Sequence, residues 1–244
     1  MASATLAGGT PVTPSVDPGS VAGYVPLDAF GVTPFPVGDE QALNFNVPAY
    51  RYGGEAFTRV GITSDGYLVA GGAAGGDIQF DPLPFPNTAR RNNVLAPLWT
   101  DLDGTGTPGI FITVLTDGAS RWIVVEWRLN TFGTSELQVF QAWLGITGTE
   151  DNTFAYDPAN LPTNPEGLNL LVGAENAEGT AGDSIVGLPI GDLRVTTAPA
   201  VPGGMLTYSV QVKGVQPGLQ RVTTSLTTPI VAGTTQEVDA INVL

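Results

Sequence analysis

The chain has 244 residues with no histidine and no cysteine, and its 23 acidic against 9 basic residues give a formal net charge of −14. The missing imidazole and thiol exclude Ser-His-Asp and Cys-His catalysis, disulfides and iron–sulfur clusters, and they remove the usual ligands of a tetrahedral zinc site. Nine scattered cations cannot build a phosphate-binding face, so we expect no nucleic-acid partner. No apolar run approaches the roughly 18 residues of a membrane-spanning helix, so we expect no membrane span.

The composition favours strands and turns over helices. The chain contains 32 Gly and 20 Pro, and only 13% of its residues are charged. Such a composition is typical of short strands joined by many turns. The first residues lack the basic and apolar stretches of a signal peptide, so we expect no leader in this sequence.

Residues 1–36 contain many Gly, Pro, Ala, Thr and Val and almost no charge. Six prolines interrupt the segment too often for a helix, namely Pro11, Pro14, Pro18, Pro26, Pro34 and Pro36. The sequence therefore predicts an extended N-terminal arm. This arm is either a flexible leader or a segment that packs on a neighbouring subunit.

Residues 37–197 read as the main β-sandwich, because strand-like segments follow one another closely. Segment 57–71 predicts two strands around the tight turn Ser64-Asp65-Gly66, and segment 77–80 predicts a further short strand. The strand at 121–129 has one mixed face, which should be partly wet, and one wholly apolar face, which should point inward. The apolar face consists of Ile123, Val125, Trp127 and Leu129. With no amphipathic helix and no internal repeat, the pattern predicts an all-β fold, an antiparallel two-sheet sandwich of jelly-roll type.

A composition break at 198–204 separates a C-terminal segment, 198–244, with strands expected at 204–214, 219–226 and 235–244. These strands should pack on the sandwich or on a neighbouring subunit. Their few charges leave the strand edges poorly protected against pairing with another chain. We therefore expect a homo-oligomer or filament formed through the terminal segments.

The order of the motifs resembles nidogen-type extracellular domains. The box at 96–103, Ala-Pro-Leu-Trp-Thr-Asp-Leu-Asp, is similar to that family's Ala-Pro-Phe-Trp-x-Asp-x-Asp box, with Leu98 in the Phe position. Val139-Phe140-Gln141 is similar to its Thr-Phe-Gln strand. The succession over roughly 28–214 also resembles the β-rich region C-terminal to the catalytic domain of some actinobacterial secreted subtilisin-like proteases. The resemblance implies an extracellular, non-catalytic domain with an adhesive or accessory role.

Asp101 and Asp103 lie on one side of an extended chain beside a glycine turn. Hard cations such as Ca²⁺ prefer carboxylate and carbonyl oxygens, and Asp101, Asp103 and the carbonyl of Thr105 could supply three of them. The loop is not an EF-hand, because Ile112 stands where that motif requires Glu. Two interpretations stay open: a Ca²⁺ site, and a turn whose Asp side chains accept hydrogen bonds from nearby backbone N–H groups.

Two further groups of residues have both a structural and a functional interpretation. Glu126 and Glu175 lie in strands, and a carboxylate pair at the right distance would suit glycoside hydrolysis, although salt bridges to arginine explain them equally well. The four Trp residues suit packing in the sandwich, or a stacking platform for sugars if the rings are exposed and coplanar.

We therefore expect a non-catalytic structural or adhesive protein that self-assembles outside the cell or at the cell surface, with matrix or carbohydrate as further partners. One alternative is an accessory domain of a secreted hydrolase that binds substrate or aids export. The other is a carbohydrate-active enzyme that uses carboxylates alone. Particle size in solution separates the first two, because only self-assembly predicts an oligomer.

Overall fold

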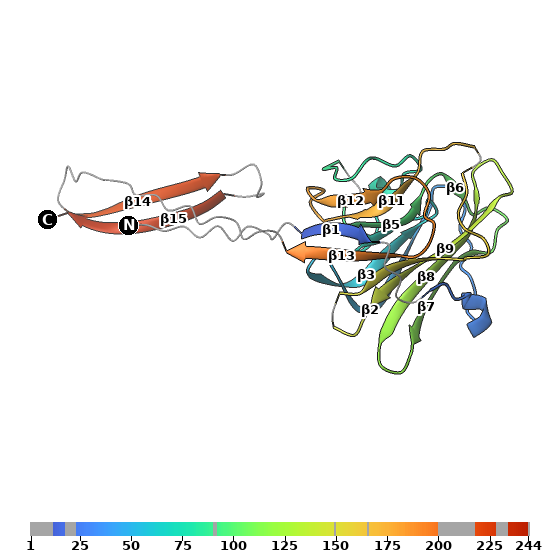
Figure 1. Ribbon diagram of the computed structural model, residues 1–244. Coiled ribbons are helices and arrows are strands. Elements are labelled where there is room, and N and C mark those ends of the chain that lie inside the picture. Colours follow the sequence, from blue (N-terminus) through green and yellow to red (C-terminus); the bar gives the residue numbers. More distant parts are fainter. Residues whose placement is uncertain are drawn as a thin grey trace. The chain divides into compact units, whose positions relative to one another are not determined.

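The computed structural model describes residues 12–17, 23–89, 92–148, 150–164, 166–199, 218–227 and 234–243. The chain divides into two compact units, one formed by Val12–Pro199 and the other by the remaining residues. The first unit consists of two sheets packed face to face, with two short 3-10 helices, η1 (Leu27–Phe30) and η2 (Gly75–Asp77) (Figure 1). The prediction of an all-β, two-sheet antiparallel sandwich is confirmed.

The first sheet has seven strands in the order β1-β13-β10-β9-β8-β6, with β7 also paired to β8. Its strands are β1 (Val12–Asp17), β6 (Leu102–Asp103), β7 (Gly109–Thr116), β8 (Arg121–Thr131), β9 (Leu137–Gly145), β10 (Asn152–Tyr156) and β13 (Leu193–Pro199). The second sheet has six strands in the order β12-β11-β5-β4-β3-β2. These are β2 (Ala42–Tyr52), β3 (Glu55–Thr63), β4 (Leu68–Ala70), β5 (Val94–Trp99), β11 (Leu171–Glu175) and β12 (Gly182–Ile185).

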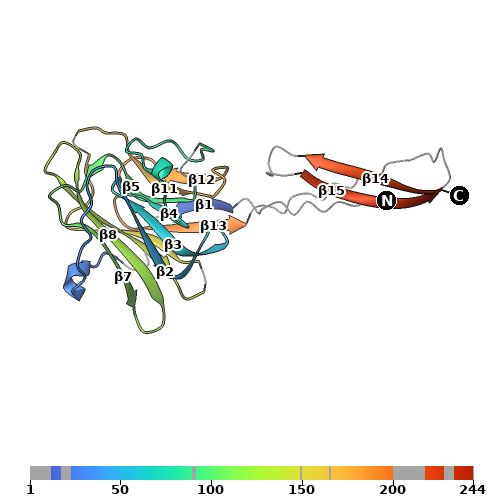
Figure 2. The same ribbon diagram turned by 180° about the vertical axis from the view of Figure 1, so that it is seen from behind.

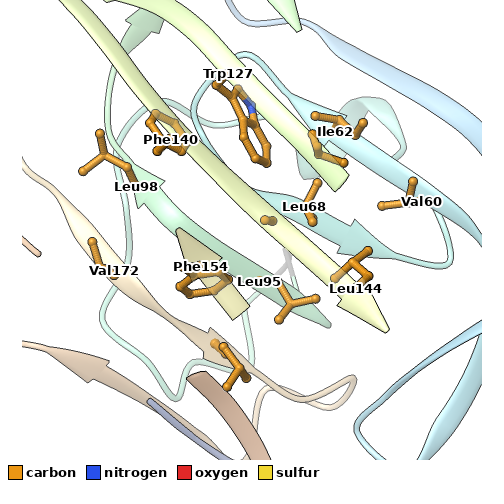
Figure 3. Packing of buried hydrophobic residues seen from close by; sticks show 14 of the residues in the cluster. Val60, Ile62, Leu68, Leu95, Leu98, Trp127, Phe140, Leu144, Phe154 and Val172 are labelled. Atoms are coloured by element: carbon orange, nitrogen blue, oxygen red, sulfur yellow. The ribbon is translucent and has the colours of Figure 1, made fainter. Parts of the chain in front are cut away.

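The core lies between the two sheets, where side chains from both inner faces interlock (Figure 3). The four apolar residues expected to point inward from β8 all belong to this cluster, as predicted. Trp127 of β8 stacks on Phe140 of β9, with ring centroids 5.1 Å apart. Its indole N–H donates to the carbonyl of Thr63 on the opposite sheet over 2.8 Å. The buried indole N–H of Trp127 therefore keeps a hydrogen-bond partner after leaving water.

The mixed outer face of β8 is partly wet, as predicted. Trp122 and Arg128 are partly exposed on it, whereas Val124 and Glu126 are completely buried. Residues 24–32 lie over this face, and Leu27 of η1 is itself fully buried in a cluster with Val124. The covering segment is distant in sequence, so the alternation within β8 alone could not reveal it.

Part of the predicted N-terminal arm is built into the sandwich. β1 pairs along its length with β13, from Val12 opposite Pro199 to Asp17 opposite Arg194. Both ribbon views place these two strands side by side (Figures 1 and 2). Further along the same segment, Phe35 forms a β-bridge with Ile110 of β7. Residues 1–11 and 18–22 of the predicted arm lie outside the described residues.

The predicted strand at 77–80 is wrong. Asp77 ends η2, and residues 78–80 form no strand. The backbone of Gln79 bonds to side chains instead of a neighbouring strand: its N–H donates to the hydroxyl of Tyr67, and its carbonyl accepts from the indole of Trp99. Once side chains satisfy these backbone groups, no ladder is needed to keep them hydrogen-bonded.

The second unit contains β14 (Gly218–Thr227) and β15 (Thr234–Val243). They form a two-stranded antiparallel sheet in continuous register from Gly218 opposite Val243 to Thr227 opposite Thr234. Strands were predicted at 219–226 and 235–244, close to these bounds. The strand expected at 204–214 lies outside the described residues.

Candidate functional site

Three loops that follow or precede core strands meet at one point of the sandwich. The N–H of Ser64, in the β3–β4 turn, donates to the carbonyl of Gln41 over 2.8 Å. The N–H of Thr100, after β5, donates to the carbonyl of Asp65 over 3.2 Å. Four carboxylates on these loops and one at the end of β6 form what we call the acidic loop cluster: Asp39, Glu40, Asp65, Asp101 and Asp103. An isolated β-bridge between Asp39 and Asp103 also joins the first loop to the third.

Asp65 is the most unusual member of the acidic loop cluster. Its side chain is completely buried, and neither of its carboxylate oxygens has a hydrogen-bond partner. The close docking of the turn explains the burial. The next residue, Gly66, has φ +77°, and a Cβ there would come within 1.9 Å of the carbonyl oxygen of Leu98. Only glycine permits this approach of the turn to β5.

The electrostatic setting of Asp65 opposes a negative charge. Burial raises the pKa of the Asp65 carboxyl to about 8, and the nearby carboxylates of Asp101, Asp39 and Glu40 act in the same direction; the backbone N–H of Leu102, which forms no regular hydrogen bond with Asp65, acts weakly against them. Burial likewise raises the pKa of Asp101 to about 6, helped by Asp39, Glu40 and Asp103. The two carboxyls therefore gain from any positive charge placed between them.

The predicted Ca²⁺ ligands Asp101, Asp103 and Thr105 are adjacent in the structure, but one of them is already engaged. The N–H of Thr105 donates to Oδ1 of Asp103 over 2.7 Å, which is the local bond expected of an Asp-containing turn. Asp101 is half-buried and Thr105 is exposed. Within the described residues, no three carboxylates lie close enough together to hold a metal ion by themselves. The predicted Ca²⁺ site stays a prediction.

The structure does not bring Glu126 and Glu175 together. Glu126 lies on the outer face of the first sheet, where its oxygens accept hydrogen bonds from the hydroxyl of Tyr24 (2.6 Å), the N–H of Leu27 (2.9 Å) and Nε of Arg128 (2.8 Å). Glu175 follows the core residue Ala174 on β11, so it points to the outer face of the other sheet.

Sheets stack about 10 Å apart, so carboxylates on two opposite outer faces are farther apart than the roughly 5–10 Å of a glycosidase pair. The three hydrogen bonds to Glu126 also give it a structural role, because they fasten residues 24–27 to β8.

One family model, described as NIDO related, matches residues 32–187, which is more than half of the chain. The chain belongs to the NIDO-related family. The resemblance to nidogen-type domains is thereby confirmed, whereas the likeness to regions of actinobacterial subtilisin-like proteases stays a prediction. No curated protein and no solved structure matches the chain.

Membership of the NIDO-related family indicates a non-catalytic extracellular β domain. The matched range contains the whole acidic loop cluster and ends just after β12. Neither helix in the described part of the chain is long and apolar enough to cross a membrane.

The tryptophans of this NIDO-related domain do not form a platform of coplanar rings. Trp99 and Trp127 are buried. Trp122 and Trp143 meet edge to face, with ring planes at 69°, and their indole N–H groups donate to Asp151 and Gln141. These two rings line a cavity of about 330 Å³ together with Val25, Phe30, Leu115, Thr116 and Asp117.

Sequence reasoning recognised the Ser64-Asp65-Gly66 turn but assigned Asp65 no other role. Asp is an ordinary turn residue, and its local pattern is the same whether the turn is solvated or buried. Its burial depends on contacts with the segment that follows β5, more than thirty positions away in the sequence. No signal within the turn itself could have distinguished the two cases.

Proposed function

We propose that this NIDO-related protein is an extracellular structural or adhesive module that associates with further copies of itself through the β14–β15 sheet. The observation that carries the proposal is the small size of this sheet. β14 and β15 pair with each other, and among the described residues no third strand pairs with either of them. A two-stranded sheet exposes an unpaired edge on each side and is marginally stable alone.

The sequence of these strands supports edge-to-edge pairing. Their twenty residues include only Arg221, Glu237 and Asp239 as charged residues, and neither Pro nor Lys. Proteins commonly protect exposed edges with Lys, Pro or bulges, whereas the register of β14 and β15 runs without a break. A strand from a second copy could therefore extend the sheet by main-chain hydrogen bonds.

Sedimentation velocity of the full chain over a range of concentrations tests this proposal, and we expect a concentration-dependent oligomer. Two variants, Thr223→Pro and Thr224→Pro, locate the contact. Consecutive residues of an antiparallel strand direct their N–H groups to opposite edges, so one proline removes an outward donor and the other an inward donor. Both variants should sediment as monomers.

The control is the melting of the sandwich, followed by tryptophan fluorescence. All four Trp residues lie within Val12–Pro199, so this signal should be unchanged in both variants. Oligomers of wild-type size in both variants would contradict the role of β14. A wild-type chain that stays monomeric would contradict self-association and favour the accessory-domain alternative. Deleting the N-terminal segment would be a poor test, because β1 and Leu27 belong to the sandwich.

A further inference from the structure

The starting observation is the unpartnered carboxylate of Asp65. Within the described residues, only four buried side-chain oxygen or nitrogen atoms lack a hydrogen-bond partner, and two of them are the oxygens of Asp65. Burying a carboxylate without a partner is costly, so native structures neutralise it by pairing, by protonation or by a bound cation. The acidic loop cluster offers no such partner from its own side chains, because all five members are acids.

No basic side chain in the described part of the chain donates a hydrogen bond to the carboxylate of Asp65. Arg128, for example, pairs with Asp28 and Glu126 on the outer face of the first sheet. Meanwhile the turn and the segment after β5 are held together by the bond from the N–H of Thr100 to the carbonyl of Asp65. This bond holds Asp65 close to Asp101, although the two carboxylates repel each other when both are ionised.

We propose that Asp65 and Asp101 bind a hard divalent cation, Ca²⁺, at the acidic loop cluster. Ca²⁺ takes oxygen ligands, and carboxylates bind it through one or both oxygens. Neither oxygen of Asp65 has a hydrogen-bond partner, and Asp101 is partly exposed, so water molecules at Asp101 could complete the coordination. Asp39 and Glu40, both exposed, add to the negative field at the same place.

This assignment changes the ligand set that the sequence predicted. Asp101 is retained. Asp103 becomes less suitable because its Oδ1 already accepts the N–H of Thr105, and Asp65 takes its place. The cation would join the β3–β4 turn to the segment after β5, so it would fasten two loops of the sandwich. The site is independent of β14 and β15, and self-association can fail without affecting it.

Thermal unfolding of the full chain, stripped with EDTA and then supplied with CaCl₂, tests the proposal. At roughly a hundredfold excess over the dissociation constant, a single site should raise the melting temperature by about 5 to 10 °C. Asp65→Asn and Asp101→Asn should each abolish the shift. Asp117→Asn, at an acid in the exposed β7–β8 turn, is the matched control and should keep it.

Tb³⁺ luminescence provides a second measurement that does not depend on stability. Tb³⁺ occupies Ca²⁺ sites, and Trp99 lies two positions before Asp101, close enough to sensitise it. Sensitised emission should appear in the wild-type chain, fall on addition of Ca²⁺ and be absent in Asp101→Asn. This variant keeps the proposal testable if Asp65→Asn fails to fold.

Three results would overturn the proposal. The first is a wild-type melting temperature that does not respond to Ca²⁺ or EDTA, which would mean that a proton alone neutralises Asp65. The second is a full Ca²⁺ shift in Asp65→Asn. The third is a shift that is lost in Asp103→Asn but kept in Asp101→Asn, which would return the site to the Asp103 turn.

Discussion

Replacing Glu126 by Gln tests how residues 24–32 are fastened to the outer face of β8. Glu126 is completely buried and accepts three hydrogen bonds, from Tyr24, Leu27 and Arg128, at 2.6 to 2.9 Å. Gln has the same shape but only one acceptor oxygen. If that oxygen keeps Tyr24 and Arg128, the amide NH₂ faces the N–H of Leu27, and two buried donors then oppose each other.

The size of the loss follows from these contacts. A hydrogen bond to a charged group contributes about 1.5–3 kcal/mol, and a buried donor left unpaired costs about 1–3 kcal/mol. Arg128 keeps its second ion pair, with Asp28 at 2.8 Å, so its guanidinium still has an anionic partner in the variant. We therefore expect Glu126→Gln to lower the free energy of unfolding by about 3 kcal/mol, or the melting temperature by about 6 to 12 °C.

Urea unfolding followed by tryptophan fluorescence measures this loss, because all four Trp residues report on the sandwich. Glu178→Gln, at an exposed loop position, is the matched control and should change stability by less than about 0.5 kcal/mol. A double-mutant cycle with Tyr24→Phe should show a coupling of about 1 kcal/mol. If Glu126→Gln behaves like Glu178→Gln, the buried carboxylate does not fasten the segment and our reasoning is wrong.

Two further predictions concern a turn and an ion pair. Gly66→Ala should lower the free energy of unfolding by at least about 3 kcal/mol, because the new Cβ would meet the carbonyl of Leu98. Gly106 has a similar φ of +74° but open space around it, so Gly106→Ala should lower the free energy of unfolding by only about 1 kcal/mol. Equal urea midpoints for the two variants would contradict this. The hydrogen bond from Arg128 holds the pKa of the Asp28 carboxyl below its ordinary 3.8. The ionised pair therefore stabilises the folded state at neutral pH. This stabilisation is lost as the pH falls through the folded-state pKa and Asp28 takes up a proton. The difference in the free energy of unfolding between wild type and Asp28→Asn should therefore be largest near neutral pH and should shrink in strong acid. A difference that grows on acidification would contradict a stabilising role of the ionised Asp28–Arg128 pair.

The sequence was sufficient for features that depend on neighbouring residues. Alternation along 121–129 correctly identified the four inward residues of β8, and the turn at 64–66 was placed correctly between β3 and β4. It was not sufficient for features that depend on distant segments. The burial of Glu126 comes from a segment about a hundred positions earlier, so the strand pattern alone could not show which residues of the partly wet face are covered.

The acidic loop cluster shows the same limit. The sequence drew attention to Asp101 and Asp103 because they are close neighbours in the chain. The structure adds Asp65, Asp39 and Glu40, which come from other loops and converge through backbone hydrogen bonds and a β-bridge. Spacing along the chain cannot show that these loops meet in space. The structure shows it, and it also shows that the oxygens of Asp65 are buried without a hydrogen-bond partner.

The pairing of β1 with β13 also determines how the sandwich responds to mechanical load. Val12, at the start of β1, lies opposite Pro199, at the end of β13, so the chain joins the sandwich and leaves it at neighbouring points. Tension between the segments that flank Val12 and Pro199 would therefore pull β1 away from β13 at one end of the ladder. The hydrogen bonds between the two strands would break one after another from that end, instead of all at once in shear. Under tension, this edge would peel apart while the interior of the sandwich carried little of the force.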